Sequence, residues 1–310
     1  MQILFICQPG PEYGQSLMYH GLRQLGHHVV DYPYNHTFHF RVLQPCKQDC
    51  KNGPCTIPGP IGCTNHPAHL SMLSLDAIDH KWDLVVSNNG AGHPELHQAL
   101  ARTGVPIIAL DQGDAPHDSW NAWRQCIGTD KFFFFRREFF KGQPGFPLPY
   151  SYYGIKGGAF AQKKHSVAFL YRPTNQERQK FAVEMIDYPD AIIGEYSHHE
   201  YLNILSESKF AVALRGAGWD TLRYWEIPAM GAILCRMPSP IEIPNDFEDG
   251  VNCVEFNTID ELKDKISHYL KHPIVYNTVR LKSLEHFKKF HTTEARARYM
   301  LEKIGIGNDK

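Results

Sequence analysis

The sequence has almost no net charge: 32 lysine and arginine residues stand against 33 aspartate and glutamate residues, a formal balance of −1. A chain without an overall positive field does not concentrate a polyanion, so composition does not imply a nucleic-acid partner, although a local basic cleft would average out. Hydrophobic residues make up 43% and charged residues 21%, which excludes a largely disordered chain. A chain of 310 residues is longer than one hydrophobic core usually organises, so we expect two domains.

Long hydrophobic runs are also missing. The first ten residues carry no basic region and too few apolar residues for a signal peptide or a membrane span. The apolar run Phe132–Phe135 ends at Arg136. We therefore expect a cytoplasmic protein without a membrane span, whose eight cysteines are thiols or metal ligands rather than disulfides.

Strand and helix patterns alternate along both halves of the chain. Short apolar runs predict strands at Gln2–Cys7, 27–33, 82–89, 105–111, 131–137, 165–173, 191–196, 210–218 and 232–237. Helical spacing of apolar residues predicts helices at Ser16–Leu25, 94–104, 175–186, 198–208, 220–231, 258–272 and 278–303. Repeated strand–helix–strand units predict an open parallel sheet with helices on both faces.

The sequence thus predicts an α/β protein with two Rossmann-like, doubly wound domains. The first spans residues 1–150 and the second residues 165–280, joined by a Pro-, Gly- and Tyr-rich linker near Pro144–Lys164. Two such domains place the carboxyl ends of both sheets across a shared cleft, where ligands bind in these folds.

The segment from residue 214 to 233 carries the strongest signal. A strand runs into small residues flanked by Gly216 and Gly218, and Asp220 or Thr221 then opens a helix. Free amide groups and the positive helix end would bind a phosphate there. Arg215 would add a contact to the same anion, and Glu226 would accept from sugar hydroxyls, so a diphosphate with a ribose fits.

Other interpretations of these residues remain open: the glycines could make a tight turn, Arg215 could pair with Asp220, and Glu226 could cap or solvate a helix. The predicted donor-binding residues include further positions after strands and beside the turn. The full set is Arg172, Tyr196, Arg215, Gly216, Gly218, Trp219, Asp220, Thr221, Arg223 and Glu226.

The second half resembles the nucleotide-sugar-binding domain of GT-B glycosyltransferases of the family 1 type, in particular the CgeB-like and exostosin-like branches. Glu226, Ala229 and Gly231 in EIPAMG match the family pattern, and the spacing of Arg223 and Glu226 in TLRYWE is similar. The resemblance implies that Glu226 binds the donor ribose. The segment FHTTEARARYML is similar to the family's closing helix and implies that residues 281–310 return to the first domain.

One feature departs from the resemblance. Many retaining members carry a second acidic residue eight positions before the ribose ligand, where this chain has Gly218. We therefore expect inversion, which needs a base near the acceptor hydroxyl. Asp111 and Asp114 are the leading candidates and His93 follows, although both aspartates could instead cap the turn or helix after their strand.

No Asp-x-Asp triplet occurs in a cleft loop, so a bridging metal ion is not required. Arg172, Arg215 and the helix amides would balance the departing phosphate, which agrees with the metal-independent chemistry that the resemblance implies.

A Cys-rich insertion at about residues 37–69 interrupts the first domain. Cys46, Cys50, Cys55 and Cys63 could close around a structural zinc ion, with free thiols or disulfides as the alternatives. The remaining cysteines, Cys7, Cys126, Cys235 and Cys253, lie in or beside apolar runs and are expected to be small buried hydrophobes.

Three functions follow from these patterns. The first is an inverting, metal-independent glycosyltransferase that uses a nucleotide-sugar, with a UDP-sugar favoured, and a glycan, protein or small molecule as acceptor. The second is a glycosyltransferase for modified bases of DNA, and the third is a non-catalytic nucleotide- or sugar-binding protein. A dehydrogenase is not expected, because the first strand leads into QPGPEYG and not a GxGxxG turn.

Overall fold

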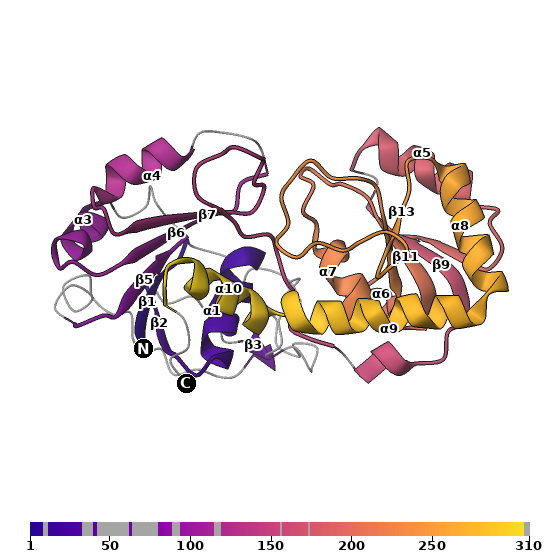
Figure 1. The fold of residues 1–310 in the computed structure, drawn as a ribbon, viewed down its shortest axis with the longest axis horizontal. Helices are drawn as coiled ribbons and strands as arrows, with labels where there is room; N and C mark the ends of the chain where they lie inside the picture. Colours follow the sequence, from indigo (N-terminus) through magenta and orange to yellow (C-terminus); the bar gives the residue numbers. More distant parts are fainter. Residues whose placement is uncertain are drawn as a thin grey trace. The chain divides into compact units, whose positions relative to one another are not determined.

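The computed structural model describes residues 1–8, 12–32, 40–41, 62–63, 80–88, 94–114, 119–155, 157–172 and 174–306. Two compact units make up this described part: Met1–Pro149 together with the segment from Arg296 onward, and Tyr150–Ala295. Each unit has its own parallel sheet with helices around it (Figure 1). The α/β class and the two Rossmann-like parallel sheets are thereby confirmed.

The sheet of the first unit has the strand order β2-β1-β5-β6-β7-β8. Its strands are β1 (Gln2–Ile6), β2 (His28–Tyr32), β5 (Leu84–Ser87), β6 (Ile107–Asp111), β7 (Phe132–Arg136) and β8 (Phe146–Pro147). Its helices are α1 (Tyr13–Gln24), α3 (Pro94–Arg102), α4 (Ser119–Ile127) and α10 (Thr293–Lys303). A separate antiparallel pair joins β3 (Phe40–Arg41) and β4 (Gly62–Cys63).

Alternation of side chains along the strands makes two core layers in this unit. Ile3 and Phe5 of β1 pack in the layer that holds α1 and α10, while Leu4 and Ile6 pack in the layer that holds α3 and α4. Every second residue of a strand points to the same face, so a continuous apolar run covers both faces of a buried parallel strand.

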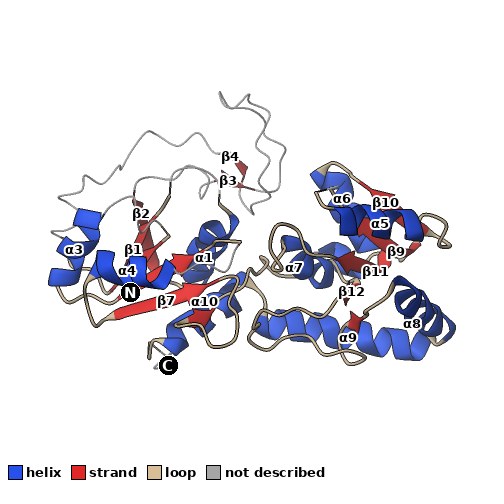
Figure 2. Ribbon diagram, turned by 90° about the horizontal axis from the view of Figure 1, so that it is seen from above, coloured by secondary structure: helices blue, strands red, loops and turns tan. Residues whose placement is uncertain are grey.

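The sheet of the second unit has the strand order β10-β9-β11-β12-β13. Its strands are β9 (His165–Leu170), β10 (Ala191–Gly194), β11 (Ser208–Ala213), β12 (Ile233–Arg236) and β13 (Val254–Glu255). Its helices are η2 (Gly157–Phe160), α5 (Gln176–Met185), α6 (His198–Glu207), α7 (Leu222–Ala229), α8 (Ile259–Lys271) and α9 (Pro273–Phe290). Figure 2 shows helices α5 to α9 around the short strands.

The helices of the second unit cover both faces of its sheet. Leu205 of α6 and Trp225 of α7 belong to one core layer, and Phe181 of α5 and Ile266 of α8 belong to the other. The parallel register brings the carboxyl ends of β9, β10 and β11 to one edge. That edge carries the loops in which the predicted donor-binding residues lie.

The predicted single helix over residues 278–303 is wrong. The structure has two helices there, α9 and α10, and the helical conformation is interrupted between them at His291 and Thr292. The carbonyl oxygen of His291 accepts from the amide of Tyr152 at 3.1 Å, and the amide of Thr293 donates to the oxygen of Tyr152 at 2.9 Å. These bonds to a distant segment replace helical ones, and Thr292 Oγ1 then caps the new helix by accepting from Ala295 N.

Within the described ranges, no helix is both long and apolar enough to cross a membrane. Cys7, Cys235 and Cys253 are buried, as expected, whereas Cys126 is only half-buried. Three of the proposed zinc ligands, Cys46, Cys50 and Cys55, lie outside the described residues. The fourth, Cys63, is described as backbone of β4 only.

Candidate functional site

The loop between β11 and α7, residues 214–221, is the centre of the candidate site. It leaves the carboxyl end of β11 and enters α7 at Thr221, which is the N-cap residue and has extended backbone (φ −109°, ψ 149°). The Thr221 side chain makes no capping hydrogen bond. The first N–H groups of α7 therefore do not donate to that hydroxyl. A helix whose first N–H groups lack a side-chain acceptor can bind an anion at its amino end.

Helix α5 holds this loop through Arg178. Its Nε donates to the carbonyl oxygen of Arg215 at 2.8 Å, and its Nη2 donates to that of Leu214 at 2.9 Å. Asn175 adds a 3.3 Å bond from Nδ2 to the same Arg215 oxygen. Arg178 is only 4% exposed, and burial, followed by the charge of Arg223, lowers its pKa to about 10. The guanidinium thus stays charged at neutral pH, and its hydrogen bonds to the carbonyl oxygens at the end of β11 are charge-assisted.

Both glycines of the loop lie in a tight turn. The amide of Gly216 donates to the carbonyl oxygen of Gly218 at 2.9 Å, so this amide is engaged within the loop. A β-carbon on Gly216 would stand 3.3 Å from Nη2 of Arg178, tighter than most real contacts. A larger residue would therefore push the loop away from Arg178.

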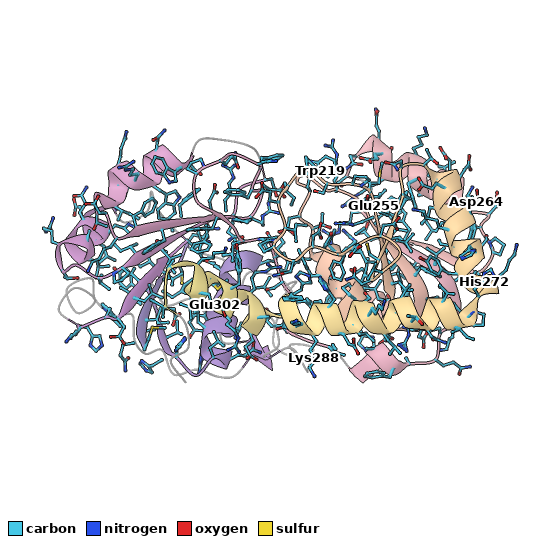
Figure 3. The ribbon with its side chains drawn as sticks, viewed as in Figure 1. Trp219, Glu255, Asp264, His272, Lys288 and Glu302 are labelled. Carbon is cyan, nitrogen blue, oxygen red and sulfur yellow. The ribbon has the colours of Figure 1, made fainter. Side chains whose placement is uncertain are left out.

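Arg215 and Trp219 lie beside each other at the surface of the loop. The Arg215 guanidinium carbon is 5.4 Å from the Trp219 ring centroid, and its Nε is 3.4 Å from Oε2 of Glu177. The partner of Arg215 is therefore Glu177 and not Asp220, the alternative that the sequence left open. Figure 3 labels Trp219 on this loop.

Arg172 and Tyr196 occupy the neighbouring strand ends. Arg172 Nε donates to Oε1 of Glu195 at 2.8 Å, and 74% of the Arg172 side chain is exposed. An ion pair this exposed contributes little to stability, so both side chains can rearrange around a ligand. Tyr196 is also exposed, and its ring lies against Gly194.

Asp220 is turned into the protein. Its Oδ2 accepts from the amide of Tyr150 at 2.6 Å, and its Oδ1 accepts from Nε1 of Trp225 at 2.7 Å. The carboxylate is buried. Asp220 therefore ties the loop to the start of the unit and to α7, and both of its oxygens are engaged.

Glu226, the predicted ribose ligand, is buried on α7. Its Oε2 accepts from the hydroxyl of Tyr201 at 2.6 Å. Burial raises the pKa of Glu226, while the Tyr201 hydrogen bond and the Arg223 charge lower it. Arg223 donates from Nε to the carbonyl oxygen of Leu170 at the end of β9, 2.6 Å away, so Arg223 and Glu226 share one corner of the site.

In the first unit, Asp111 and Asp114 differ sharply in exposure. Asp111 ends β6 and is buried; its Oδ1 accepts from Gly113 N at 3.0 Å and its Oδ2 from Ser119 Oγ at 2.5 Å. Asp114 is 55% exposed and pairs with Arg137. The turn-capping interpretation thus describes Asp111, whereas Asp114 offers its carboxylate to solvent. His93 lies outside the described residues.

Two features of the site were not predicted: Arg178, which holds the loop, and Tyr201, which binds Glu226. Both lie on helices, whereas the residues predicted from sequence mostly follow strands directly. Arg178 lies in the first turn of α5, the helix that follows Arg172 in the chain, and a cation at that position is a sequence signal for the role.

Part of the chain, including the loop at residues 214–221, matches a known protein family. Residues 167–302 match the model of a protein family described as glycosyl transferase-like. No curated protein sequence matches the chain.

Several solved structures match the chain over nearly its whole length. A glycosyltransferase from Rickettsia africae ESF-5 matches with a TM-score of 0.60 and 10% identity, over 98% of this chain and 97% of that chain. Anabaena Alr3699/HepE in complex with UDP matches with a TM-score of 0.58 and 10% identity, over 98% of this chain and 100% of that one. An alpha-glucosyltransferase in complex with UDP and a 13-mer DNA containing a HMU base matches with a TM-score of 0.57 and 11% identity, over 98% and 99%. At identities this low, the likeness to these structures establishes a shared fold and nothing more.

Proposed function

We propose that this chain is a nucleotide-sugar glycosyltransferase with the GT-B fold, and that it transfers a sugar from a UDP-sugar to an acceptor hydroxyl with inversion and without a metal ion. The observation that carries the proposal is the loop at residues 214–221, held by Arg178 and leading into α7 within the segment that matches the glycosyl transferase-like model. UDP is the nucleotide in the solved complexes of the same fold from Anabaena and with DNA. The narrower resemblance to the CgeB-like and exostosin-like branches stays a prediction.

The donor diphosphate is assigned to the amino end of α7, with Arg215 and Arg172 as its cations. Both guanidinium groups are exposed and form weak surface ion pairs, with Glu177 and Glu195, which a diphosphate can replace. Two cations and the helix amides would offset the charge that develops on the leaving UDP, so this chemistry needs no bridging metal ion.

Glu226 is assigned to the donor ribose. Tyr201 occupies Oε2 and fixes the orientation of the carboxylate, which leaves Oε1 as the acceptor for a ribose hydroxyl. Gly218 stands where retaining members carry their second acidic residue, which supports inversion.

Asp114 is the preferred base for the acceptor hydroxyl. A general base must reach the proton it removes, and Asp114 is exposed whereas Asp111 is buried and holds Gly113 and Ser119. Arg137, which is buried and pairs with Asp114, positions the carboxylate.

The test is a panel of nucleotide-sugars incubated with the protein, with and without EDTA, scored for release of the nucleoside diphosphate. We expect release from a UDP-sugar that EDTA does not reduce, with an inverted anomeric configuration in the product by NMR. Glu226→Ala is expected to abolish donor binding. A retained configuration, or release that EDTA abolishes, would overturn the respective part of the proposal.

DNA as acceptor has one observation in its favour, the fold shared with a glucosyltransferase bound to DNA containing a HMU base. At 11% identity this likeness extends to the fold only, and the net charge of −1 offers no general attraction to DNA. Retardation of duplex DNA that weakens steeply with salt would establish this alternative, because salt competes with phosphate contacts.

A further inference from the structure

A second polar cluster lies in the Tyr150–Ala295 unit, at the opposite edge of the sheet from the loop at residues 214–221. Lys163 stands just before β9 and Ser206 just before β11, so both lie at the amino-terminal ends of their strands. Nζ of Lys163 donates to the carbonyl oxygen of Ser206 at 2.7 Å. Helix α9, which runs along this unit in Figure 1, contributes Tyr276 and Arg280, one turn apart on the same face.

This cluster holds two positive charges without a matching negative one. Within the described part of the chain, no salt bridge joins Lys163 or Arg280 to a carboxylate. The adjacent carboxylate, Glu207, is engaged by Lys164 at 2.6 Å and lies 3.9 Å from His165. Burial, followed by the charge of Arg280, lowers the pKa of Lys163 to about 7, so the amine is partly desolvated and within electrostatic reach of the Arg280 guanidinium.

Two buried polar atoms of the cluster have no hydrogen-bond partner among the described residues: the hydroxyl of Tyr276 and Nη1 of Arg280. Tyr276 is 8% exposed, and its ring packs on Phe210 with 5.5 Å between centroids, so it cannot swing out to solvent. A buried donor left without an acceptor lowers the stability of the fold, and it does so more strongly when it carries charge. Burial raises the pKa of the Tyr276 hydroxyl to about 12, and the charge of Arg280, one turn further along α9, acts in the opposite direction.

We propose that Lys163, Arg280 and Tyr276 form a binding site for a phosphate-type oxyanion, either free phosphate or the phosphate group of a lipid. A tetrahedral oxyanion accepts hydrogen bonds from several directions at once, and so can take one from each of these side chains. Its charge also offsets that of the two cations. This site is separate from the donor site, because it lies at the amino-terminal edge of the sheet.

Calorimetric titration of inorganic phosphate into the full chain tests the site. The double variant Lys163→Met/Arg280→Met is compared with the matched double variant Lys164→Met/Lys282→Met, which removes two exposed lysines from the same region. We expect the first variant to bind phosphate at least about tenfold more weakly than the wild type, since charge-assisted hydrogen bonds are lost, and the second to bind like the wild type. Phosphate that enters the donor loop binds both variants equally, so only their difference reports this site.

Equal binding by the two double variants would overturn the proposal, whatever the donor proves to be.

A second readout needs no variant: acetylation of Lys163 by acetic anhydride at pH 7, followed by mass spectrometry. Phosphate is expected to slow this reaction by keeping the amine protonated, with Lys164 as the internal reference. An unchanged ratio of Lys163 to Lys164 acetylation would contradict the site.

Sedimentation with vesicles of phosphatidylcholine, with and without phosphatidic acid, separates the two sources of the anion. Binding that requires phosphatidic acid and Lys163 identifies a lipid, and its absence identifies free phosphate.

Discussion

The hydroxyl of Tyr201 donates a 2.6 Å hydrogen bond to Oε2 of Glu226, and both side chains are buried. Burial favours the neutral acid, while Tyr201 and Arg223 favour the carboxylate. The charge and the orientation of Glu226 therefore depend on these two partners. This pair links helix α6 to helix α7 and gives the candidate ribose ligand one fixed position.

Tyr201→Phe should weaken donor binding while leaving turnover at saturating donor nearly unchanged. The substitution keeps the ring but removes the donor to Glu226, and a hydrogen bond to a charged group is worth about 1.5–3 kcal/mol, or roughly 10- to 100-fold in KM. Steady-state kinetics with the UDP-sugar measures both parameters. Tyr188→Phe is the control, because the Tyr188 hydroxyl bonds to Ser267 on α8, away from the loop. An unchanged donor KM for Tyr201→Phe would remove Tyr201 from the site.

Arg178→Met should loosen the loop at residues 214–221 and weaken UDP binding. The variant leaves the carbonyl oxygens of Leu214 and Arg215 without their charged donor, and we expect a loss of about tenfold or more in affinity by calorimetry. Lys180→Met on the same helix is the control, since Lys180 is exposed and forms only a surface pair with Glu184. Equal affinities for the two variants would show that Arg178 does not support the donor loop.

Asp114→Asn and Asp111→Asn should separate the base from the residue that supports its loop. Loss of a general base lowers kcat by about 10²- to 10⁴-fold, so Asp114→Asn should reduce turnover while UDP binding persists. Asp111→Asn should instead lower the free energy of unfolding by about 1–3 kcal/mol, because it disturbs the bonds to Gly113 and Ser119. Turnover that is normal in Asp114→Asn and lost in a folded Asp111→Asn would reverse the assignment.

The free energy of unfolding should rise with pH above neutrality in buffers free of phosphate. Lys163 has a folded-state pKa of about 7 against an ordinary value of 10.5, so between these values the unfolded chain binds a proton that the folded chain does not. The destabilisation is therefore complete below pH 7 and is relieved as pH rises to 10.5, by at most about 1.4 kcal/mol per pH unit. The charge of Arg280 acts on Lys163 from α9, and Glu207 is engaged by Lys164. Urea unfolding of wild type and Lys163→Met measures this; parallel pH profiles would contradict it.

Much of the fold could be predicted because its signals are local. A buried parallel strand must be apolar on both faces, so runs such as 105–111 and 165–173 indicate their conformation without reference to the rest of the chain. The break between α9 and α10 could not be predicted, since it depends on backbone bonds from Tyr152, far away in sequence. Residues 278–303 contain no glycine or proline that would have marked it.

The candidate site divides in the same way. By itself the sequence determined the alternation of strands and helices in both halves, and with it the edge of the sheet at which Arg172, Arg215 and Glu226 would gather, because parallel strands all end at one edge. Only the tertiary structure decided which side chains are engaged: Asp220 turns inward to Tyr150 and Trp225, Arg178 reaches from α5 to the loop, and Lys163 meets Arg280. Hydrogen bonds and charges act between residues that folding brings together, and spacing along the chain does not encode those distances.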